Sequence, residues 1–453
     1  MIRPSRIARG IVAFVAACTL VACSDVPEDA LPEFGAAPPP ARHADTALGN
    51  RLGGAPEITV AGDSLNAGLL RRFYARHGFE PVWTTRPAQA NALVNAVLRA
   101  GDHGLDPALF HAELLRRRAT LPPLERDLVL SDAFLSFADA LAQGAVPIGR
   151  RRDNETLAPE PINVAAALDA AIGSRDPAAV IEALAPTTPT YQALRQALRR
   201  YRSGARAGDV NRLRTIAVNL ERQRWLPRQL PADRVWVNVA DQRLVLLRAG
   251  RPVFSTRVVV GDDAAAKQSP EFRTLIEASF YNPPWIIPSD IVVAEILPKI
   301  SRDPDYLVRN DMVMLAGGDI AQRAGPTAGL GLIMFDMPNR FDVYLHDTPN
   351  KQAFARDNRR ISHGCIRVQN PFEFAALLMQ RPIGEINQGI AMGGTTRNAL
   401  SAPVPVFVVY QTAFVDAGGA LQFRPDFYSR DAEIWRQLQR HPQARNTLAL
   451  AEH

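Results

Sequence analysis

A cysteine with two nearby histidines is the arrangement in this sequence best suited to chemistry. Cys365 follows His363 and Gly364 directly, and 18 residues separate it from His346. A free thiol ionises near pH ~8.5, so a nucleophilic cysteine needs a base or a cation beside its sulfur. Either histidine can supply this, and Gly364 permits an unusual backbone angle before the nucleophile. We therefore predict nucleophilic catalysis by Cys365, with the backbone N–H groups of Gly364 and Cys365 as donors to an oxyanion.

Strands are predicted to position these residues. Residues 344–349 are expected to end one strand, and residues 362–368 to lie on a neighbouring one. We predict a mainly-β catalytic domain over residues 233–415, with a Pro- and Gly-rich cap inserted at about 281–331. The predicted strands are 234–239, 243–247, 253–260, 332–335, 341–345 and 405–412, and the predicted helices are 291–297 in the cap and 372–378.

An all-α domain is predicted before the strands, which makes the chain an α+β multidomain protein. Apolar residues recur at helical spacing over residues 59–205, and a junction helix and linker follow over 206–232. A C-terminal extension over 416–453 is predicted to end in a helix, and its sequence indicates no function.

Four polar residues of the all-α domain have predicted positions. Ser131 is predicted to cap the N-terminus of a helix. His77, His103 and His111 have no companions at metal-ligand spacing. We expect turn or surface positions for these three histidines.

The N-terminus is predicted to be an export signal. Basic residues precede a short apolar run that is too short to span a bilayer. The run ends at Leu20–Cys23, which resembles the bacterial lipobox, so residues 1–22 are predicted to be a lipoprotein signal peptide and Cys23 a lipid anchor. An anchor at Cys18 and a plain cleaved signal are alternatives. Residues 23–58 are rich in Pro, Ala and Gly, which predicts a tether.

Composition narrows the classes of protein and partner. The 453 residues indicate two or three domains, and 47% hydrophobic with 22% charged residues is typical of a soluble globular protein. The chain has three cysteines, of which two lie in the signal region, so the exported body holds one cysteine in an oxidising compartment. The net charge of +6 includes no basic stripe interleaved with aromatic residues, so no nucleic-acid partner is expected.

The two motifs resemble the L,D-transpeptidase family with the YkuD-type catalytic domain, whose pattern is a histidine, a gap, and then Ser/Thr-His-Gly-Cys. Its large branch carries a helical scaffold domain, which residues 73–202 resemble. Further likeness to that branch lies in Trp285, Pro288, Glu295–Lys299, Asp303-Pro304, His346–Pro349 and Cys365–Val368.

The resemblance implies a role for each catalytic residue. Cys365 is the nucleophile, and His346 is the base that activates it. The backbone carbonyl of Asp347 orients the His346 ring, His363 tunes the thiol, and Gly364 shapes the loop before the nucleophile.

The resemblance also implies residues that bind substrate. Ser362 holds the loop by hydrogen bonding, and Arg367 meets a substrate carboxylate in forked geometry. Tyr344 and Trp285 line the cleft. A structural salt bridge is the alternative for Arg367, and core packing is the alternative for the two aromatic residues.

The implied reaction is peptidoglycan L,D-transpeptidation without a cofactor or metal. The thiolate attacks a diaminopimelate carbonyl of a donor stem peptide, expels D-Ala, and passes the acyl group to an amine of a neighbouring stem. Carbapenems are expected to acylate the same thiol. Two alternatives are hydrolysis, which would make an L,D-carboxypeptidase, and a metal-binding or interaction protein with zinc on His346, His363, Cys365 and Asp347.

One departure from the branch leaves the product open. The branch usually has a peptidoglycan-binding module before the junction helix, whereas here residues 201–210 run directly into it. Ala328 also departs slightly from the branch. Both 3→3 and 1→3 cross-links therefore stay possible products. The expected partners are stem peptides, the membrane through a lipid anchor, and envelope proteins through the helical scaffold, in the periplasm and by preference at the outer membrane.

Overall fold

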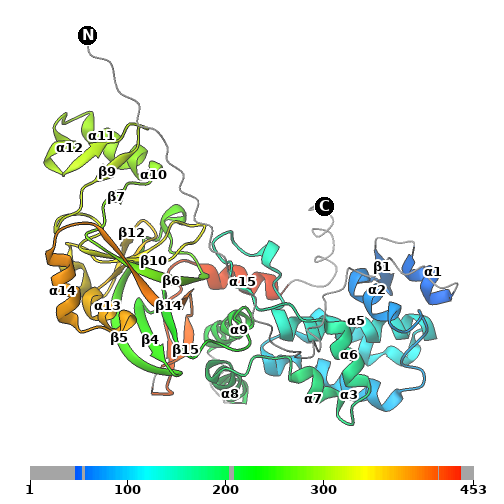
Figure 1. Ribbon diagram of the computed structural model, residues 1–453. Helices are drawn as coiled ribbons and strands as arrows, with labels where there is room; N and C mark the ends of the chain where they lie inside the picture. The colour runs from blue at the N-terminus through cyan, green and yellow to red at the C-terminus, as the bar shows by residue number, and fades with distance from the viewer. Residues whose placement is uncertain (1–45, 54–56, 204–208, 417, 440–453) are drawn as a thin grey trace, which may run out of the picture. The chain divides into compact units, whose positions relative to one another are not determined.

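The computed structural model describes residues 46–53, 57–203, 209–416 and 418–439 (Figure 1). The predicted signal peptide, the Cys23 anchor, most of the tether and the last part of the C-terminal extension lie outside these residues. Within the described residues, every helix is too short or too polar to cross a membrane.

Helices form the N-terminal part of the described chain, as predicted. The long helix α5 packs against α2, α3 and α6 and is buried along most of its length. A short hairpin, β1 (Ile58–Val60) with β2 (Asp63–Leu65), adds strands to a region predicted to be all-α. The helices are α1 (Ala47–Gly53), α2 (Ala67–Ala75), α3 (Pro87–Leu98), α4 (Ala112–Arg116), α5 (Pro123–Gln143), α6 (Val164–Ile172), α7 (Pro177–Glu182), α8 (Pro189–Ser203) and α9 (Val210–Arg224).

Local sequence signals explain where several of these helices begin. The side chains of Asn66, Asn163 and Asp176 accept hydrogen bonds from the first turns of α2, α6 and α7. Proline stands at the start of α3, α5 and α7, where its missing N–H costs nothing.

The predicted helix start at Ser131 is wrong. Helix α5 begins at Pro123, and Ser131 lies fully buried in its middle. The Ser131 hydroxyl lies 2.7 Å from the hydroxyl of Tyr74 and accepts a hydrogen bond of 2.8 Å from the ring nitrogen of Trp83. Its polar side chain therefore satisfies two buried aromatic side chains instead of capping a helix.

His111 lies in a turn, as predicted, but His111 and His103 are both buried and do not lie at the surface. His111 is buried between Asp63 and Asp132, at 2.9 and 2.7 Å. Burial lowers the pKa of His111, but the hydrogen bonds and charges of the two carboxylates outweigh it and raise that pKa to about 9. His103 is also buried, and burial with nearby arginines lowers its pKa to about 2. His77 is half-buried beside a carboxylate of α6.

A mixed sheet follows the helices, and a closed core lies inside it. Its order is β12-β5-β13-β11-β10-β6-β14-β3-β4, and a further pairing of β4 with β5 closes the sheet on itself. The strands are β3 (Arg234–Asn238), β4 (Arg243–Arg248), β5 (Arg251–Gly261), β6 (Phe272–Tyr281), β10 (Ile333–Asp336), β11 (Leu345–His346), β12 (Arg360–Ser362), β13 (Ile366–Val368) and β14 (Thr396–Val409).

Two helices, α13 (Pro371–Met379) and α14 (Ile383–Ala391), pack on this core (Figure 1). Phe374 of α13 lies 5.9 Å from Phe254 and 4.7 Å from Phe335, measured between ring centroids. Aromatic contacts of this kind fix the helix against the strands. The helix predicted at 372–378 is thereby confirmed.

Several strands differ from the sequence prediction, and β14 begins at Thr396 although a strand was predicted only over 405–412. The strand predicted over 341–345 contains only Leu345 of the observed β11, because residues 341–344 form a turn and loop. Strand β6 was not predicted at all. Its burial does not alternate regularly, so the sequence carries no clean period of two.

The cap has its own small core. A three-stranded sheet in the order β7-β9-β8 packs with short helices around Ile287, Ile291, Ile296, Met312 and Ile320. The predicted helix 291–297 lies inside a longer helical run whose middle, Val292–Ile296, is a π-helical turn. The cap elements are β7 (Trp285–Ile286), α10 (Ser289–Ile291), α11 (Leu297–Ile300), α12 (Tyr306–Arg309), β8 (Met312–Met314) and β9 (Ile320–Gln322).

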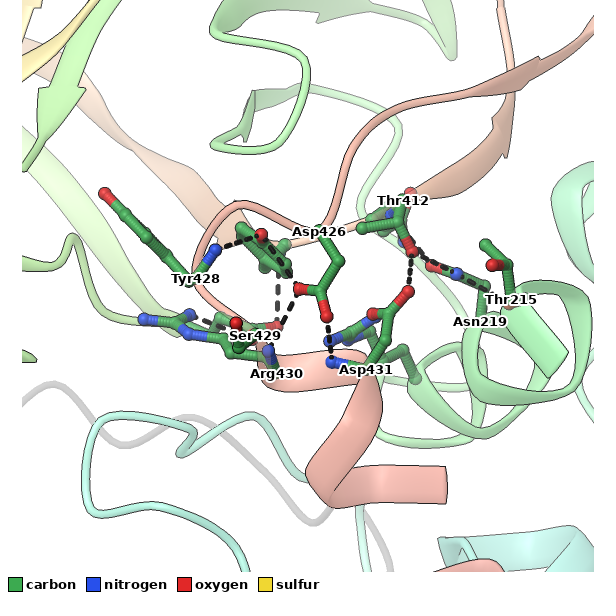
Figure 2. Close-up of polar contacts among 12 residues, drawn as sticks. Thr215, Asn219, Thr412, Asp426, Tyr428, Ser429, Arg430 and Asp431 are labelled. Carbon is green, nitrogen blue, oxygen red and sulfur yellow. Dashed lines mark hydrogen bonds and ion pairs between the residues drawn. The ribbon is translucent and has the colours of Figure 1, made fainter. Parts of the chain in front are cut away.

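The C-terminal segment joins the helical region to the sheet. It contains β15 (Ala413–Val415), β16 (Leu421–Phe423) and α15 (Arg430–Leu438), and α15 packs on α9. Apolar residues of β14 and α15 belong to the same core as the helices. Polar contacts accompany them, since Asn219 of α9 donates to Thr412 at 2.7 Å and Thr412 donates to Asp431 at 2.7 Å (Figure 2).

Candidate active site

Two short parallel strands bring the predicted site residues together. Leu345 of β11 lies beside Ile366 of β13, and His346 lies beside Arg367. Side chains alternate between the two faces of a strand, and Leu345 and Ile366 point into the core. The alternation therefore places His346, Cys365 and Arg367 together on the opposite face of the strand pair.

The Cys365 thiol is half-buried and has polar neighbours on both sides. Its sulfur lies 3.7 Å from the carbonyl oxygen of Asp342, and the backbone N–H of Tyr344 donates to it. Burial raises the pKa of the thiol, and the Tyr344 N–H and the charge of Arg367 act against that rise without cancelling it. The resting group is therefore a thiol, and a base must remove its proton during attack.

The His346 ring is buried in its neutral form. Burial and the positive charge of Arg367 lower its pKa to about 4, against the opposing effect of the carbonyls of Asp347 and Leu330. The ring nitrogen Nδ1 donates to the backbone carbonyl of Asp347 at 2.5 Å, as the family resemblance implied. This tautomer leaves Nε2 as the nitrogen that can accept a proton.

The proton path from sulfur to ring is not closed in this structure. Among the described residues, no hydrogen bond joins the His346 ring to the Cys365 thiol. Catalytic hydrogen bonds often tighten only when substrate is bound. The two side chains share one face at neighbouring positions, which is the arrangement such a contact requires.

The Asp347 side chain holds the carbonyl that orients His346. Its carboxylate accepts from the backbone N–H of Leu332 at 3.0 Å and forms an ion pair with Lys351. Its own backbone N–H donates to Ile333 at 2.8 Å. Gly331, at φ +63°, has no room for a Cβ, which would overlap the Asp347 carboxylate. Asp347 is thus fixed from three directions.

Ser362 closes the loop that leads to the predicted nucleophile, residues 362–365 (the nucleophile loop). The Ser362 hydroxyl donates to the carbonyl of Cys365 at 2.6 Å and accepts from the N–H of Gly364 at 3.2 Å. Gly364 has φ +113°, a conformation that favours glycine. The Gly364 N–H is therefore already used. Of the two predicted oxyanion donors, the Cys365 N–H is the one without a hydrogen-bond partner among the described residues.

A glutamate of the cap reaches the nucleophile loop. The ring nitrogen Nε2 of His363 lies 2.6 Å from the carboxylate of Glu295, and the Lys267 ammonium lies 3.4 Å from the same oxygen. Burial raises the pKa of Glu295, but these two partners outweigh it and lower that pKa. In the sequence Glu295 is recognisable only as part of a family motif, and no sequence pattern marks Lys267.

The proposed substrate-binding side chains lie in different surroundings. Arg367 is half-buried and forms no ion pair within the described chain, so the salt-bridge alternative finds no support. Its Nε is buried without a partner. Tyr344 lies beside Cys365 and packs partly on the core. Trp285 packs on the cap core and closely over Gly329, so its position fits the packing alternative.

The geometry does not gather a metal site. His346 and His363 turn to different partners, Asp347 and Glu295, and Cys365 faces a carbonyl. In the described part of the chain, no three His, Cys, Asp or Glu residues are placed to hold a metal ion.

A cavity of about 490 Å³ lies away from these groups. The helical region contributes its loop around Arg151 and Glu155, and the sheet region contributes Arg273, Arg340 and Phe341. None of the predicted site residues lines it, so the candidate chemistry is not placed there.

Known proteins share both halves of this organisation. Residues 68–198 match the scaffold-domain model, and residues 232–404 match the model described as the L,D-transpeptidase catalytic domain. A Haemophilus influenzae protein named "Putative L,D-transpeptidase" is 25% identical over 393 residues, which cover 81% of this chain and 78% of that protein.

Solved structures give weaker likenesses. An L,D-transpeptidase from Mycobacterium smegmatis has 13% identity and a TM-score of 0.22, over 39% of this chain and 58% of its own. A cysteine-to-serine mutant of an Enterococcus faecium L,D-transpeptidase has 11% identity and a TM-score of 0.20, over 40% and 50%. The chain thus spans about half the length of these solved relatives.

Proposed function

We propose that this chain, whose residues 68–198 match the scaffold-domain model and residues 232–404 the L,D-transpeptidase catalytic-domain model, cross-links peptidoglycan with Cys365 as its nucleophile. The observation that supports this most directly is the shared face of His346 and Arg367 on two paired strands, with Cys365 directly before the second strand. The proposed nucleophile and the neutral ring proposed as its base thus lie beside a cation that has no ion-pair partner among the described residues.

The first chemical step acylates the enzyme. Nε2 of His346 takes the thiol proton while the Cys365 sulfur attacks the diaminopimelate carbonyl of a donor stem peptide. The N–H of Cys365 stabilises the oxyanion. The carbon–nitrogen bond to D-Ala then breaks, and the leaving amine takes the proton from the His346 imidazolium.

The second step transfers the acyl group. An amine of a neighbouring stem attacks the thioester carbonyl and gives its proton to His346. The carbon–sulfur bond breaks, the product amide leaves, and the proton returns to the thiolate. Water in place of the amine would give hydrolysis, which is the carboxypeptidase alternative.

The electrostatics of the site suit this order of events. Burial keeps the His346 imidazole neutral and the thiol protonated at rest. Charge therefore develops only when substrate is attacked, where a fixed N–H donor is most effective. The unpaired guanidinium of Arg367 stabilises the developing thiolate and is available to a substrate carboxylate in forked geometry.

Substrate engagement is assigned to the catalytic domain and the cap. Helix α8 ends at Ser203 and α9 begins at Val210, which leaves no room for a separate binding module between them. The linkage formed, 3→3 or 1→3, then depends on which acceptor amine the cleft admits. Acylation at Cys23 would hold the enzyme on a bacterial envelope membrane facing peptidoglycan in the periplasm.

Product analysis tests the proposal. The purified full chain and its Cys365→Ala variant are mixed with tetrapeptide muropeptides, and the products are identified by mass spectrometry. Cross-linked dimers that vanish in the variant are expected, and fragmentation distinguishes 3→3 from 1→3 links. Tripeptides without dimers would assign hydrolysis instead, and identical products from both proteins would refute Cys365 as the nucleophile.

A further inference from the structure

Ser269 is a fully buried serine behind the nucleophile loop, and each of its polar groups is hydrogen-bonded. Its hydroxyl donates to the carbonyl of Gly364 at 2.7 Å and accepts from the N–H of Gly261 at 2.9 Å. Its N–H donates to the hydroxyl of Tyr428 at 3.3 Å, and its carbonyl accepts from Arg430 at 2.9 Å. A side chain bound on every side can hold its neighbour in one orientation.

The hydrogen bond from Ser269 fixes the direction of the Cys365 N–H. The C=O of Gly364 and the N–H of Cys365 belong to one planar peptide group, and in a trans peptide they point in opposite directions. Ser269 holds the carbonyl toward the interior. The Cys365 N–H therefore points away from the interior, where it has no partner among the described residues.

We propose that Ser269 is a positioning residue for the transferase reaction, which orients the Cys365 N–H toward the oxyanion. This inference rests on the proposed function, since only attack on a carbonyl creates that oxyanion. Gly364 supports it, because a residue without a Cβ restricts the orientation of the following peptide little, and among the described residues Ser269 is the side chain that binds the Gly364 carbonyl.

The C-terminal segment anchors Ser269 in turn. Arg430 is fully buried, and its charge meets the carboxylate of Glu271 at 3.1 Å. The carboxylate of Asp426 accepts from the backbone N–H groups of Arg430 and Asp431, both at 2.9 Å, at the start of α15 (Figure 2). The hydroxyl of Tyr428 donates to the carbonyl of Gly261 at 2.5 Å. The backbone at Gly261 and at the start of α15 is thus held by hydrogen bonds, in addition to the side chains.

This anchor lies outside the region that the family model covers. The match ends at residue 404, whereas Tyr428, Arg430 and the whole of α15 follow it. The extension to which the sequence assigned no function therefore holds the nucleophile loop through Ser269.

Two reagents separate positioning from general thiol reactivity. Imipenem acylates a thiol through attack on a carbonyl, which forms an oxyanion. Iodoacetamide alkylates a thiol at a saturated carbon, which forms none. Rates at Cys365 are read by peptide mapping of the full chain, so that the other cysteines do not contribute.

The variants compared are Ser269→Ala and Ser279→Ala. Ser279 is the matched control, because it is equally buried, lies on β6 of the same sheet, and its hydroxyl has no hydrogen-bond partner. Ser269→Ala is expected to slow acylation about 10- to 100-fold, as misplaced oxyanion donors do, and to change alkylation less than about twofold. Ser279→Ala should leave both rates unchanged.

Three results would contradict the inference. If imipenem acylated Cys365 of the Ser269→Ala variant at the wild-type rate, the Ser269 hydroxyl would not position the loop. Equal losses of acylation and alkylation would show a general disturbance of the thiol. A wild-type chain that imipenem does not acylate, while iodoacetamide does alkylate it, would refute the proposed function and this inference with it.

A second variant guards against misfolding of the first. Tyr428→Phe removes one hydroxyl that contacts Ser269 through the N–H and leaves the bond from Ser269 to Gly364 in place. It should slow acylation by a smaller factor than Ser269→Ala and spare alkylation. Near-UV circular dichroism of each variant establishes that the fold is kept. A larger loss of acylation rate in Tyr428→Phe than in a folded Ser269→Ala would refute the proposal that Tyr428 acts on the loop only through Ser269.

Discussion

Protonation of His346 in acid should abolish acylation at Cys365, and this should occur at a pH well below that at which exposed histidines titrate. The pKa of His346 is about 4, against an ordinary value of 6.5, because the ring is buried and Arg367 lies beside it. This lowering of the pKa favours the neutral ring by about 3 kcal/mol. A neutral ring is the form that accepts the thiol proton, so activity should persist down to about pH 5.

Replacing Arg367 by methionine tests the second cause of this shift. The variant removes the positive charge but keeps a long apolar side chain beside the ring. The acid limb of the acylation rate should then move upward from a midpoint near 4, yet stay below 6.5 because burial, the larger cause, persists. Arg397→Met is the matched control, since Arg397 lies on β14 and pairs with Asp336.

The assay is the rate of Cys365 acylation by imipenem after short contact times, between pH ~3.5 and ~8, with circular dichroism at each pH. A wild-type midpoint between pH 6 and 7 would show that the base is not the buried His346. An unmoved midpoint in Arg367→Met, or an equal movement in Arg397→Met, would refute the role assigned to Arg367.

Three further outcomes are expected. The fold raises the pKa of His111 from 6.5 to about 9, so the protonated ring stabilises the fold by up to about 3 kcal/mol. This stabilisation is full below pH 6.5 and is lost as the pH rises through 9. Urea unfolding should show the decline, and His111→Gln should abolish it. Glu295→Gln should change the free energy of unfolding by less than about 1 kcal/mol, because its ion pair with His363 is partly exposed. It should nevertheless speed amide hydrogen exchange in the helical turn Val292–Ile296 of the cap. Unchanged exchange would show that the contact does not hold the cap. Gly331→Ala should slow acylation by about 100-fold, since its Cβ displaces Asp347 and with it the orienting carbonyl, and a wild-type imipenem rate would contradict this.

The proposed reacting groups could be chosen from the sequence because they lie in short local motifs. Cys365 and His346 belong to two such motifs, and the pairing of β11 with β13 brings them together as expected for neighbouring strand ends. The hydrogen bond from His346 to the Asp347 carbonyl involves adjacent residues, so it too depends little on distant packing. The helical region and the mainly-β domain followed from periodicity, which reports burial of one face.

The supporting groups could not be predicted, because buried polar contacts have no sequence period. Ser131 and His111 have the residue types of caps and turns, yet both are buried and satisfied by partners far along the chain. Ser269 lies 95 residues from the carbonyl that it holds. Arg430 lies in a segment with no motif. Such residues are recognised only once the tertiary structure places their partners beside them.

The buried charges explain why the nucleophile loop depends on parts of the chain so distant from it. Arg430 and Arg222 are almost completely removed from water, which is costly unless carboxylates compensate them. Glu271 comes from the sheet region and pairs with Arg430, whereas Asp431 comes from α15 and pairs with Arg222 of α9. Neither arginine can be buried until the helix, the sheet and the C-terminal segment are all in place. The same assembly places Arg430 on the carbonyl of Ser269, so we expect the geometry of the nucleophile loop to depend on α9, the sheet region and the C-terminal segment together.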